Sequence, residues 1–138
     1  MSEKPLVSVI INCFNGEKYL KEAINSVINQ TYKNWEIIFW DNLSNDKSAE
    51  IFKNYKDDRL NYFRAEEHSK ILYKARNFAL EKAKGEFIAF LDVDDWWLPE
   101  KLEKQIPLFN KPEIGLVYGN AWLFFEKKNK KKILKKKT

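Results

Sequence analysis

The sequence predicts an α/β fold, with a mostly parallel open sheet and helices on both of its faces. Two observations support this fold class. Short β-branched runs are typical of buried strands, and in the segments between them apolar residues recur at helical spacing. The 138 residues fit one domain, and the hydrophobic content of 44% is that of a globular protein rather than a disordered chain.

The N-terminal part contains two strand–helix units. LVSVIIN (6–12) and WEIIFW (35–40) are continuous apolar runs, as expected for strands that are covered on both faces. Between them, the segment 15–30 carries apolar residues at helical spacing. After the second run, Asp46 or a neighbour is placed to cap another helix. The predicted order of this part is therefore βαβα.

The following segment continues the alternation. A short strand is predicted near 60–64, and the amphipathic sequence 71–84 predicts a helix. Gly85 follows that helix directly, where a C-terminal cap belongs. EFIAFL (86–91) is another apolar run and predicts the fourth strand of the sheet.

Beyond the fourth strand, Pro99 can open one more helix, and a fifth strand is predicted at 115–125. We expect a single domain to cover residues 1–126 and a lysine-rich tail to cover 127–138, which hold eight lysines and no acid. Removing these eight lysines from the net charge of +5 leaves −3 for the domain. The basic character therefore belongs to the tail.

The tail is expected to be solvated and mobile, as single-sign charge runs usually are. Peripheral contact with anionic lipid is the alternative. Nucleic-acid binding is not expected, because no aromatic residues are interleaved with the lysines.

Cytoplasm is the default compartment, since no signal peptide or membrane span is predicted and the single cysteine, Cys13, excludes an internal disulfide. We expect Cys13 to be a small buried filler.

Polar side chains gather where three predicted strands end. In an open α/β sheet, ligands bind beyond the carboxyl ends of the strands. The end of the fourth strand is unusual because FLDVDDWW (90–97) places three carboxylates within four positions. We therefore predict a binding site at this edge of the sheet. The residues at the three strand ends are Asn12, Phe14, Asp41, Asn42, Asp92, Asp94 and Asp95.

Two of these carboxylates suit a metal ion. If the chain is still extended there, the side chains of Asp92 and Asp94 leave the same face. Carboxylate oxygens that lie close together suit Mg²⁺ or Mn²⁺, which complete their coordination with water and substrate phosphate. The alternative is a helix N-terminus, where carboxylates are favoured by the helix dipole. We prefer that alternative for Asp95.

Five ordered features of the chain resemble one known family. They are a first strand ending near Phe14-Asn15, the NQTY turn (29–32), Asp41 with Ser44 and Asp46, Ala75-Arg76-Asn77, and KGEFIAFLDVDD (84–95). Together they resemble the nucleotide-sugar-binding part of the family-2 glycosyltransferases, which have the Rossmann-like GT-A fold. The resemblance runs from about Leu6 to Gln105.

The resemblance implies a nucleotide-sugar donor, with a UDP-sugar favoured. Asp92 and Asp94 would hold Mn²⁺ or Mg²⁺ against its diphosphate. The amide of Asn42, at a position where the family usually has an aspartate, could pair with a pyrimidine edge. The nucleotide-binding residues implied in this way are Asn12, Phe14, Asp41, Asn42, Arg76 and Asp92.

Several neighbouring residues have two readings. Arg76 would lie near the base and diphosphate, or would be an exposed helical arginine. His68 is expected to be a loop residue, with a phosphate or sugar contact as the alternative. Trp96 and Trp97 are expected to serve packing, with a platform for a sugar ring as the alternative. Ile71 stands where many relatives of the family have glycine.

The resemblance further implies an inverting transfer to a saccharide or lipid-linked acceptor in cell-surface glycan synthesis, at the inner face of the membrane. Such a transfer needs a general base, which the family carries beyond the fifth strand. Glu126 is the only acid there, so no catalytic residue is assigned. We expect a fragment that binds nucleotide but transfers sugar poorly. Apolar surface left exposed in a fragment would favour a homodimer.

Other classes of protein fit less well. A non-catalytic nucleotide-binding or assembly module is the main alternative. A dinucleotide-binding oxidoreductase needs a glycine-rich turn after the first strand. The chain has Asn-Cys-Phe-Asn-Gly at 12–16 instead.

Overall fold

The computed structural model of the chain describes residues 4–125 and 130–134. The chain folds as two compact units, residues 1–102 and 103–138. This division falls earlier than the predicted end of the domain at residue 126, which stays a prediction. In the part of the chain that the structure describes, no helix is long and apolar enough to cross a membrane.

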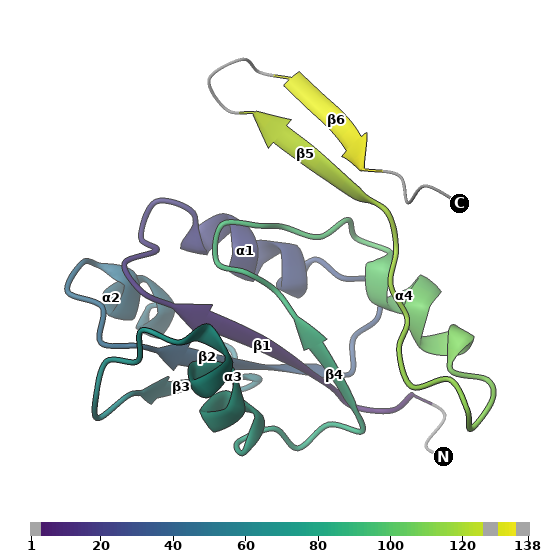
Figure 1. Cartoon of the computed structure of the whole chain (residues 1–138), viewed down its shortest axis with the longest axis horizontal. Coiled ribbons are helices and arrows are strands. Elements are labelled where there is room, and N and C mark those ends of the chain that lie inside the picture. Colours follow the sequence, from purple (N-terminus) through teal and green to yellow (C-terminus); the bar gives the residue numbers. More distant parts are fainter. Residues whose placement is uncertain (1–3, 126–129, 135–138) are drawn as a thin grey trace. The chain divides into compact units, whose positions relative to one another are not determined.

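The first unit is built on a four-stranded parallel sheet in the order β3-β2-β1-β4 (Figure 1). All of its neighbouring strands pair in parallel, so the predicted fold class is confirmed. The strands are β1 (Val7–Cys13), β2 (Trp35–Asp41), β3 (Leu60–Arg64) and β4 (Phe87–Phe90).

Helices cover both faces of this sheet, which explains why β1 and β2 are buried almost throughout. On one face, Ala79 of α3 (Leu72–Leu80) packs against Ile10 and Ile38. On the other face, the ring of Phe52 in α2 (Ser48–Lys53) stacks on Phe39 of β2, with 4.3 Å between ring centroids. The third helix, α1 (Leu20–Ile28), packs beside α2. Cys13 is buried in this core as predicted, and burial raises the pKa of its thiol.

Gly85 has a different role from the predicted helix cap. Helix α3 ends at Leu80, so Gly85 lies well beyond its C-terminus. The Gly85 N–H donates to Ser8 Oγ at 2.8 Å, and a Cβ at Gly85 would lie 2.6 Å from the Ser8 backbone nitrogen. The glycine is required because the chain passes directly against β1 as it enters β4.

The second unit contains most of α4 (Lys101–Gln105), a 3₁₀ turn at Ile106–Leu108 and a two-stranded antiparallel sheet. The predicted fifth strand is shorter than expected, because β5 covers only Ala121–Phe125. It pairs with β6 (Lys130–Leu134) and does not join the parallel sheet. Part of the lysine-rich tail is therefore a strand, contrary to expectation; residues 127–129 and 135–138 lie outside the described residues.

Candidate functional site

The carboxyl ends of β1, β2 and β4 meet at one edge of the sheet, as the sequence predicts. Cys13 lies opposite Asp41 in the register, and the Asn42 N–H donates to Cys13 O at 2.8 Å. The segment after β4 approaches the turn after β1, because a Cβ on Gly16 would lie 2.6 Å from Val93 Cγ2. The backbone therefore brings together the three polar segments that were singled out in the sequence.

Asp41 lies at the end of β2 and is completely buried. Its Oδ1 accepts the Ser44 N–H at 2.7 Å. Its Oδ2 accepts the Tyr62 hydroxyl at 2.5 Å and forms an ion pair with Arg64 at 3.1 Å. These partners occupy both oxygens of Asp41, so its observed contacts tie β2 to β3 and to the following turn.

Asn42 is also engaged by the protein. Its amide nitrogen donates to Ser69 O at 2.7 Å, and its amide oxygen accepts the Ser69 N–H at 2.9 Å. The sequence suggested that this amide could form a pair of hydrogen bonds with the edge of a pyrimidine. In the structure it forms such a pair with the Ser69 backbone instead. In this structure Asn42 does not present a free amide edge to a base. It fastens the loop between β3 and α3 to the end of β2.

This fastening places His68 beside Phe14. The two ring centroids are 4.4 Å apart, and His68 Nδ1 lies 2.9 Å from Asn42 O. Half of the Phe14 surface remains exposed, so the ring can still offer a face to a planar ligand. His68 lies in a loop, as expected. The local sequence carries no signal for its contact with Phe14, because that contact depends on the Asn42–Ser69 pairing.

Asn12 contributes an unpartnered donor near the end of β1. Its side-chain nitrogen is buried and has no hydrogen-bond partner among the residues the structure describes. A buried polar group without a partner costs about 1–3 kcal/mol. A ligand oxygen that reached this nitrogen would remove that cost, and the ligand contact expected of Asn12 stays a prediction.

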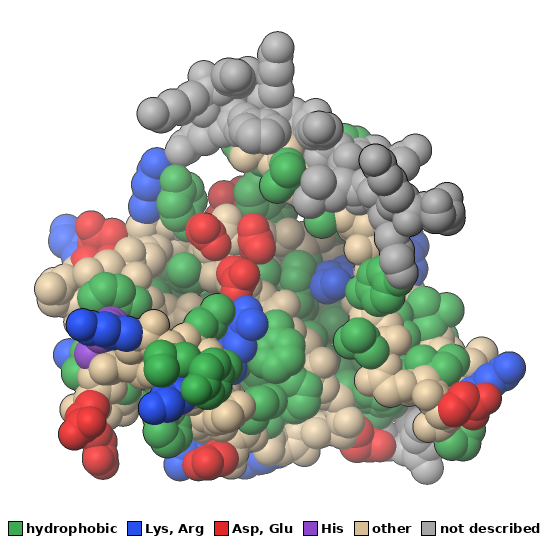
Figure 2. Space-filling view, in the orientation of Figure 1, with side chains coloured by type: hydrophobic (Ala, Val, Ile, Leu, Met, Phe, Trp, Pro, Cys, Tyr) green, Lys and Arg blue, Asp and Glu red, His purple; other side chains and the backbone are tan. Residues whose placement is uncertain are grey.

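The carboxylates after β4 adopt a turn rather than the extended form assumed from the sequence. The Asp95 N–H donates to Asp92 O at 3.0 Å, which closes the segment on itself. The side chains of Asp92 and Asp94 consequently do not continue the pattern of β4, in which successive side chains point to opposite faces of the sheet. Figure 2 shows acidic side chains gathered over the segment that follows β4. The expected helix-terminal role of Asp95 is wrong, because α4 begins only at Lys101.

Arg76 of α3 reaches this acidic group. Its guanidinium pairs with Asp92 Oδ1 at 2.8 Å, and it also lies over the Phe90 ring, 5.1 Å from the centroid. The pair is solvent-accessible, with 32% of the Arg76 side chain and 57% of the Asp92 side chain exposed. Arg76 is therefore not an unpaired, exposed helical arginine. It also does not bury Asp92, whose carboxylate stays accessible to solvent.

The carboxylates of the turn act on one another electrostatically. Burial, and then the charges of Asp94 and Asp92, raise the pKa of Asp95 above its usual range. No group of three or more His, Cys, Asp or Glu suited to a metal is found among the described residues. Mg²⁺ and Mn²⁺ need only one or two protein carboxylates when substrate phosphate completes the shell. The accessible carboxylates of Asp92 and Asp94 fit that requirement.

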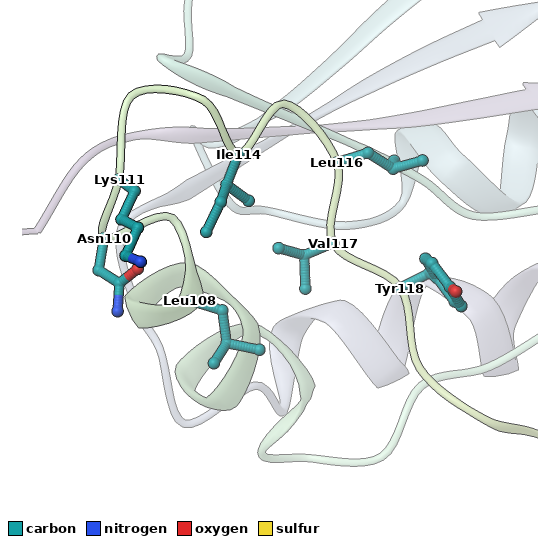
Figure 3. Close-up of a pocket in the computed structure, with 7 residues that line it drawn as sticks. All are labelled: Leu108, Asn110, Lys111, Ile114, Leu116, Val117 and Tyr118. Carbon is teal, nitrogen blue, oxygen red and sulfur yellow. The ribbon is translucent and has the colours of Figure 1, made fainter.

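The structure also contains a pocket of ≈510 Å³ in the second unit. Its lining is mainly apolar, and the side chains of Leu108, Ile114 and Val117 point toward one another (Figure 3). None of the predicted site residues lines it. Its chemistry does not suit a charged diphosphate.

Comparison with known proteins gives a consistent family assignment. The sequence model of the family described as "Glycosyl transferase family 2" matches residues 8–137. Two Escherichia coli proteins, WfgD and WfaP, are each described as a UDP-Glc:alpha-D-GlcNAc-diphosphoundecaprenol beta-1,3-glucosyltransferase. WfgD is 42% identical over 83% of this chain and 45% of its own length. WfaP is 37% identical over 86% of this chain and 47% of its own length.

Solved structures agree with this result. S. aureus TarS 1–349 in complex with UDP matches with a TM-score of 0.68 and 35% identity, over 71% of this chain and 30% of that chain. The mannosyltransferase PcManGT from Pyrobaculum calidifontis, in complex with GDP-Man and Mn²⁺, matches with a TM-score of 0.70 and 23% identity, over 83% of this chain and 35% of that chain. The chain therefore spans less than half the length of each of these relatives.

Proposed function

The chain belongs to glycosyl transferase family 2, and from this membership we propose that it forms the donor-binding part of an inverting hexosyltransferase. The donor is a nucleoside diphosphate sugar, with UDP as the favoured nucleotide. The acceptor is a saccharide or a lipid-linked saccharide used in cell-surface glycan synthesis. WfgD and WfaP, whose names specify UDP-glucose and a diphosphoundecaprenol-linked acceptor, support this choice, as does the UDP complex of TarS.

The observation that carries the proposal is the convergence of three ligand-suited groups at the edge of the sheet. Phe14 offers a half-exposed ring as a stacking face for the base. Asn12 offers an unpartnered donor. Asp92 and Asp94 lie after the neighbouring strand with their carboxylates accessible. These are the three kinds of contact that a base, a ribose or base oxygen, and a diphosphate with its cation would need.

Each residue then has a distinct task. Asp92 and Asp94 would hold Mn²⁺ or Mg²⁺, which when bound stabilises the negative charge on the departing nucleoside diphosphate. Arg76, already at 2.8 Å from Asp92, supplies a further positive group beside that site. Asn42 acts indirectly, because it holds the His68–Ser69 segment beside Phe14. Asp41 also contributes to the nucleotide site indirectly, because it anchors the turn that follows β2.

Transfer also requires a general base beside the acceptor hydroxyl. We assign this role to no residue of the chain.

We also propose that the lysine-rich residues at 127–138 make peripheral contact with anionic lipid at the cytoplasmic face of the membrane, where a lipid-linked acceptor would be presented.

Calorimetric titration with UDP tests the donor site. We expect binding that requires Mn²⁺ and that weakens at least about tenfold in Asp94→Asn, because the substitution removes a metal-binding charge while preserving shape. Asp58→Asn is the matched control, since Asp58 is an exposed aspartate that precedes β3 and lies outside the carboxyl edge of the sheet. Its affinity for UDP should be unchanged.

Two results would contradict the proposal. One is UDP binding of equal strength with and without Mn²⁺ and in Asp94→Asn. The other is no UDP binding by a chain that circular dichroism shows to be folded. A parallel titration with GDP tests the base, and stronger binding of GDP than of UDP would overturn the assignment of UDP.

A further inference from the structure

A second concave surface lies on α1, on the side of the helix away from its buried residues. Its lining includes Glu22, Asn25, Ser26 and Asn29, which recur at i, i+3, i+4 and i+7 and so form a polar stripe along the helix. The opposite stripe of α1 is buried in the core. Trp96, Trp97 and Pro99 complete the lining of a groove of ≈430 Å³, which we call the α1–tryptophan groove.

The two walls of this groove are held together by Gln30, just beyond the end of α1. The Gln30 side chain is fully buried. Its amide nitrogen donates to Leu98 O at 2.8 Å, and its amide oxygen accepts the Leu102 N–H at 3.0 Å. The Thr31 N–H also donates to Pro99 O at 2.9 Å. The tryptophan-bearing wall is therefore fixed to α1 before any ligand arrives, which reduces the entropy lost on binding.

The tryptophans offer two different surfaces to the groove. Trp96 is 40% exposed, so part of its side chain is accessible to a ligand. Trp97 is more enclosed, and Lys101 Nζ lies over its ring at 5.2 Å from the centroid. Trp96 is thus the residue able to stack on a flat apolar ligand surface, while Trp97 forms the wall behind it. An exposed indole beside polar groups is typical of a binding surface rather than of a core.

The polar stripe supplies hydrogen-bonding groups of both kinds. Asn25 Oδ1 accepts the Tyr55 hydroxyl at 2.9 Å, and this contact orients the Asn25 amide. Asn29 is exposed at the end of the stripe, and its amide carries both a donor and an acceptor. Glu22 adds a carboxylate that can accept from two hydroxyls. No lysine or arginine is among the described residues that line the groove, and its lining therefore suits a neutral polar ligand better than an anion.

We propose that the α1–tryptophan groove binds a saccharide, with a pyranose ring stacked on Trp96 and its hydroxyls bonded to Glu22 and Asn29. A pyranose has an apolar face and a rim of hydroxyls, and the groove presents an aromatic face next to amides and a carboxylate. The assignment of this saccharide to the acceptor or product glycan rests on the proposed function. It is supported by the chain connection, because Trp96 directly follows the carboxylates at 92–95.

The test uses chain labelled with 5-fluorotryptophan and followed by ¹⁹F NMR. The probes are N,N′-diacetylchitobiose and cellobiose, and sorbitol serves as a polyol without a ring face. We expect saturable shifts of the Trp96 and Trp97 signals with at least one disaccharide and none with sorbitol. The signals of the buried Trp35 and of Trp122 in the second unit should not move.

Variants make the result specific. Trp96→Ala should weaken disaccharide binding about 3- to 10-fold, the range expected for loss of an aromatic contact. Asn29→Ala should also weaken binding and leaves both tryptophans in place. Trp122→Ala is the matched control, because Trp122 is another exposed tryptophan, and it should bind normally. Urea unfolding of each variant shows whether it has retained its fold.

UDP titration of the same samples separates this inference from the proposed function. Normal UDP binding without any disaccharide-dependent shift at Trp96 would overturn the saccharide assignment alone. Disaccharide binding without UDP binding would support saccharide binding at the α1–tryptophan groove and would count against the proposed donor site. Equal disaccharide affinity in folded Trp96→Ala and in the unaltered chain would also overturn the inference.

Discussion

Gly85→Ala is expected to destabilise the chain by about 3 kcal/mol, since overpacking typically costs 1–3 kcal/mol and more where the backbone must move. The added Cβ would lie 2.6 Å from Ser8 N, 2.7 Å from Leu6 O and 2.7 Å from Ser8 Oγ. Two of these atoms belong to the backbone at the start of the central strand β1, so the clash cannot be relieved by rotating a side chain. The free energy of unfolding in urea measures the effect.

Gly115→Ala is the matched control for this prediction. A Cβ at Gly115 meets no atom within 4 Å, so its free energy of unfolding should change by less than about 0.5 kcal/mol. If Gly85→Ala were as stable as Gly115→Ala, the close passage of the chain against β1 would be wrong.

Asp41→Ala is expected to reduce the free energy of unfolding by about 2–4 kcal/mol, because it leaves two donors without their acceptor, each costing roughly 1–3 kcal/mol. These are the Tyr62 hydroxyl and the Ser44 N–H. Arg64 adds nothing to this figure, because its half-exposed side chain can be solvated instead. Urea unfolding checks the expected loss.

Two further variants show how Asp41 acts. Tyr62→Phe should cost less than Asp41→Ala, since it removes only one of the donors. Asp58→Ala, at an exposed aspartate, should leave stability within about 0.5 kcal/mol. If Asp41→Ala kept its full stability but lost UDP binding, Asp41 would contact nucleotide directly, and its anchoring role would be wrong.

The parallel sheet was predictable because its strands are long apolar runs separated by clear helical periodicity. The same patterns placed Asn12, Asp41 and the carboxylates at one edge, since carboxyl ends of parallel strands always meet there. The pairing of the fifth strand was not predictable, because it depends on a partner, β6, within a lysine-rich segment. Strand preference is strongly set by such context, which no local pattern reveals.

The details of the site were less predictable. Asn42 pairs with Ser69, 27 positions away, and no local pattern of residues signals that contact. The turn at 92–95 replaces the extended form that strand alternation suggested, because Asp95 bonds back to Asp92. The identities of the site residues could thus be proposed from sequence. Their partners, and hence whether each is free for a ligand, required the fold.

The central claim is that the carboxylates after β4 share a divalent cation with a nucleoside diphosphate. Anomalous scattering from Mn²⁺ in crystals grown with UDP tests it most directly. We predict a manganese peak within coordination distance of the Asp94 carboxylate and of diphosphate oxygens, with the uracil against Phe14. UDP bound elsewhere, or bound at this edge with no manganese beside Asp92 or Asp94, would contradict the account.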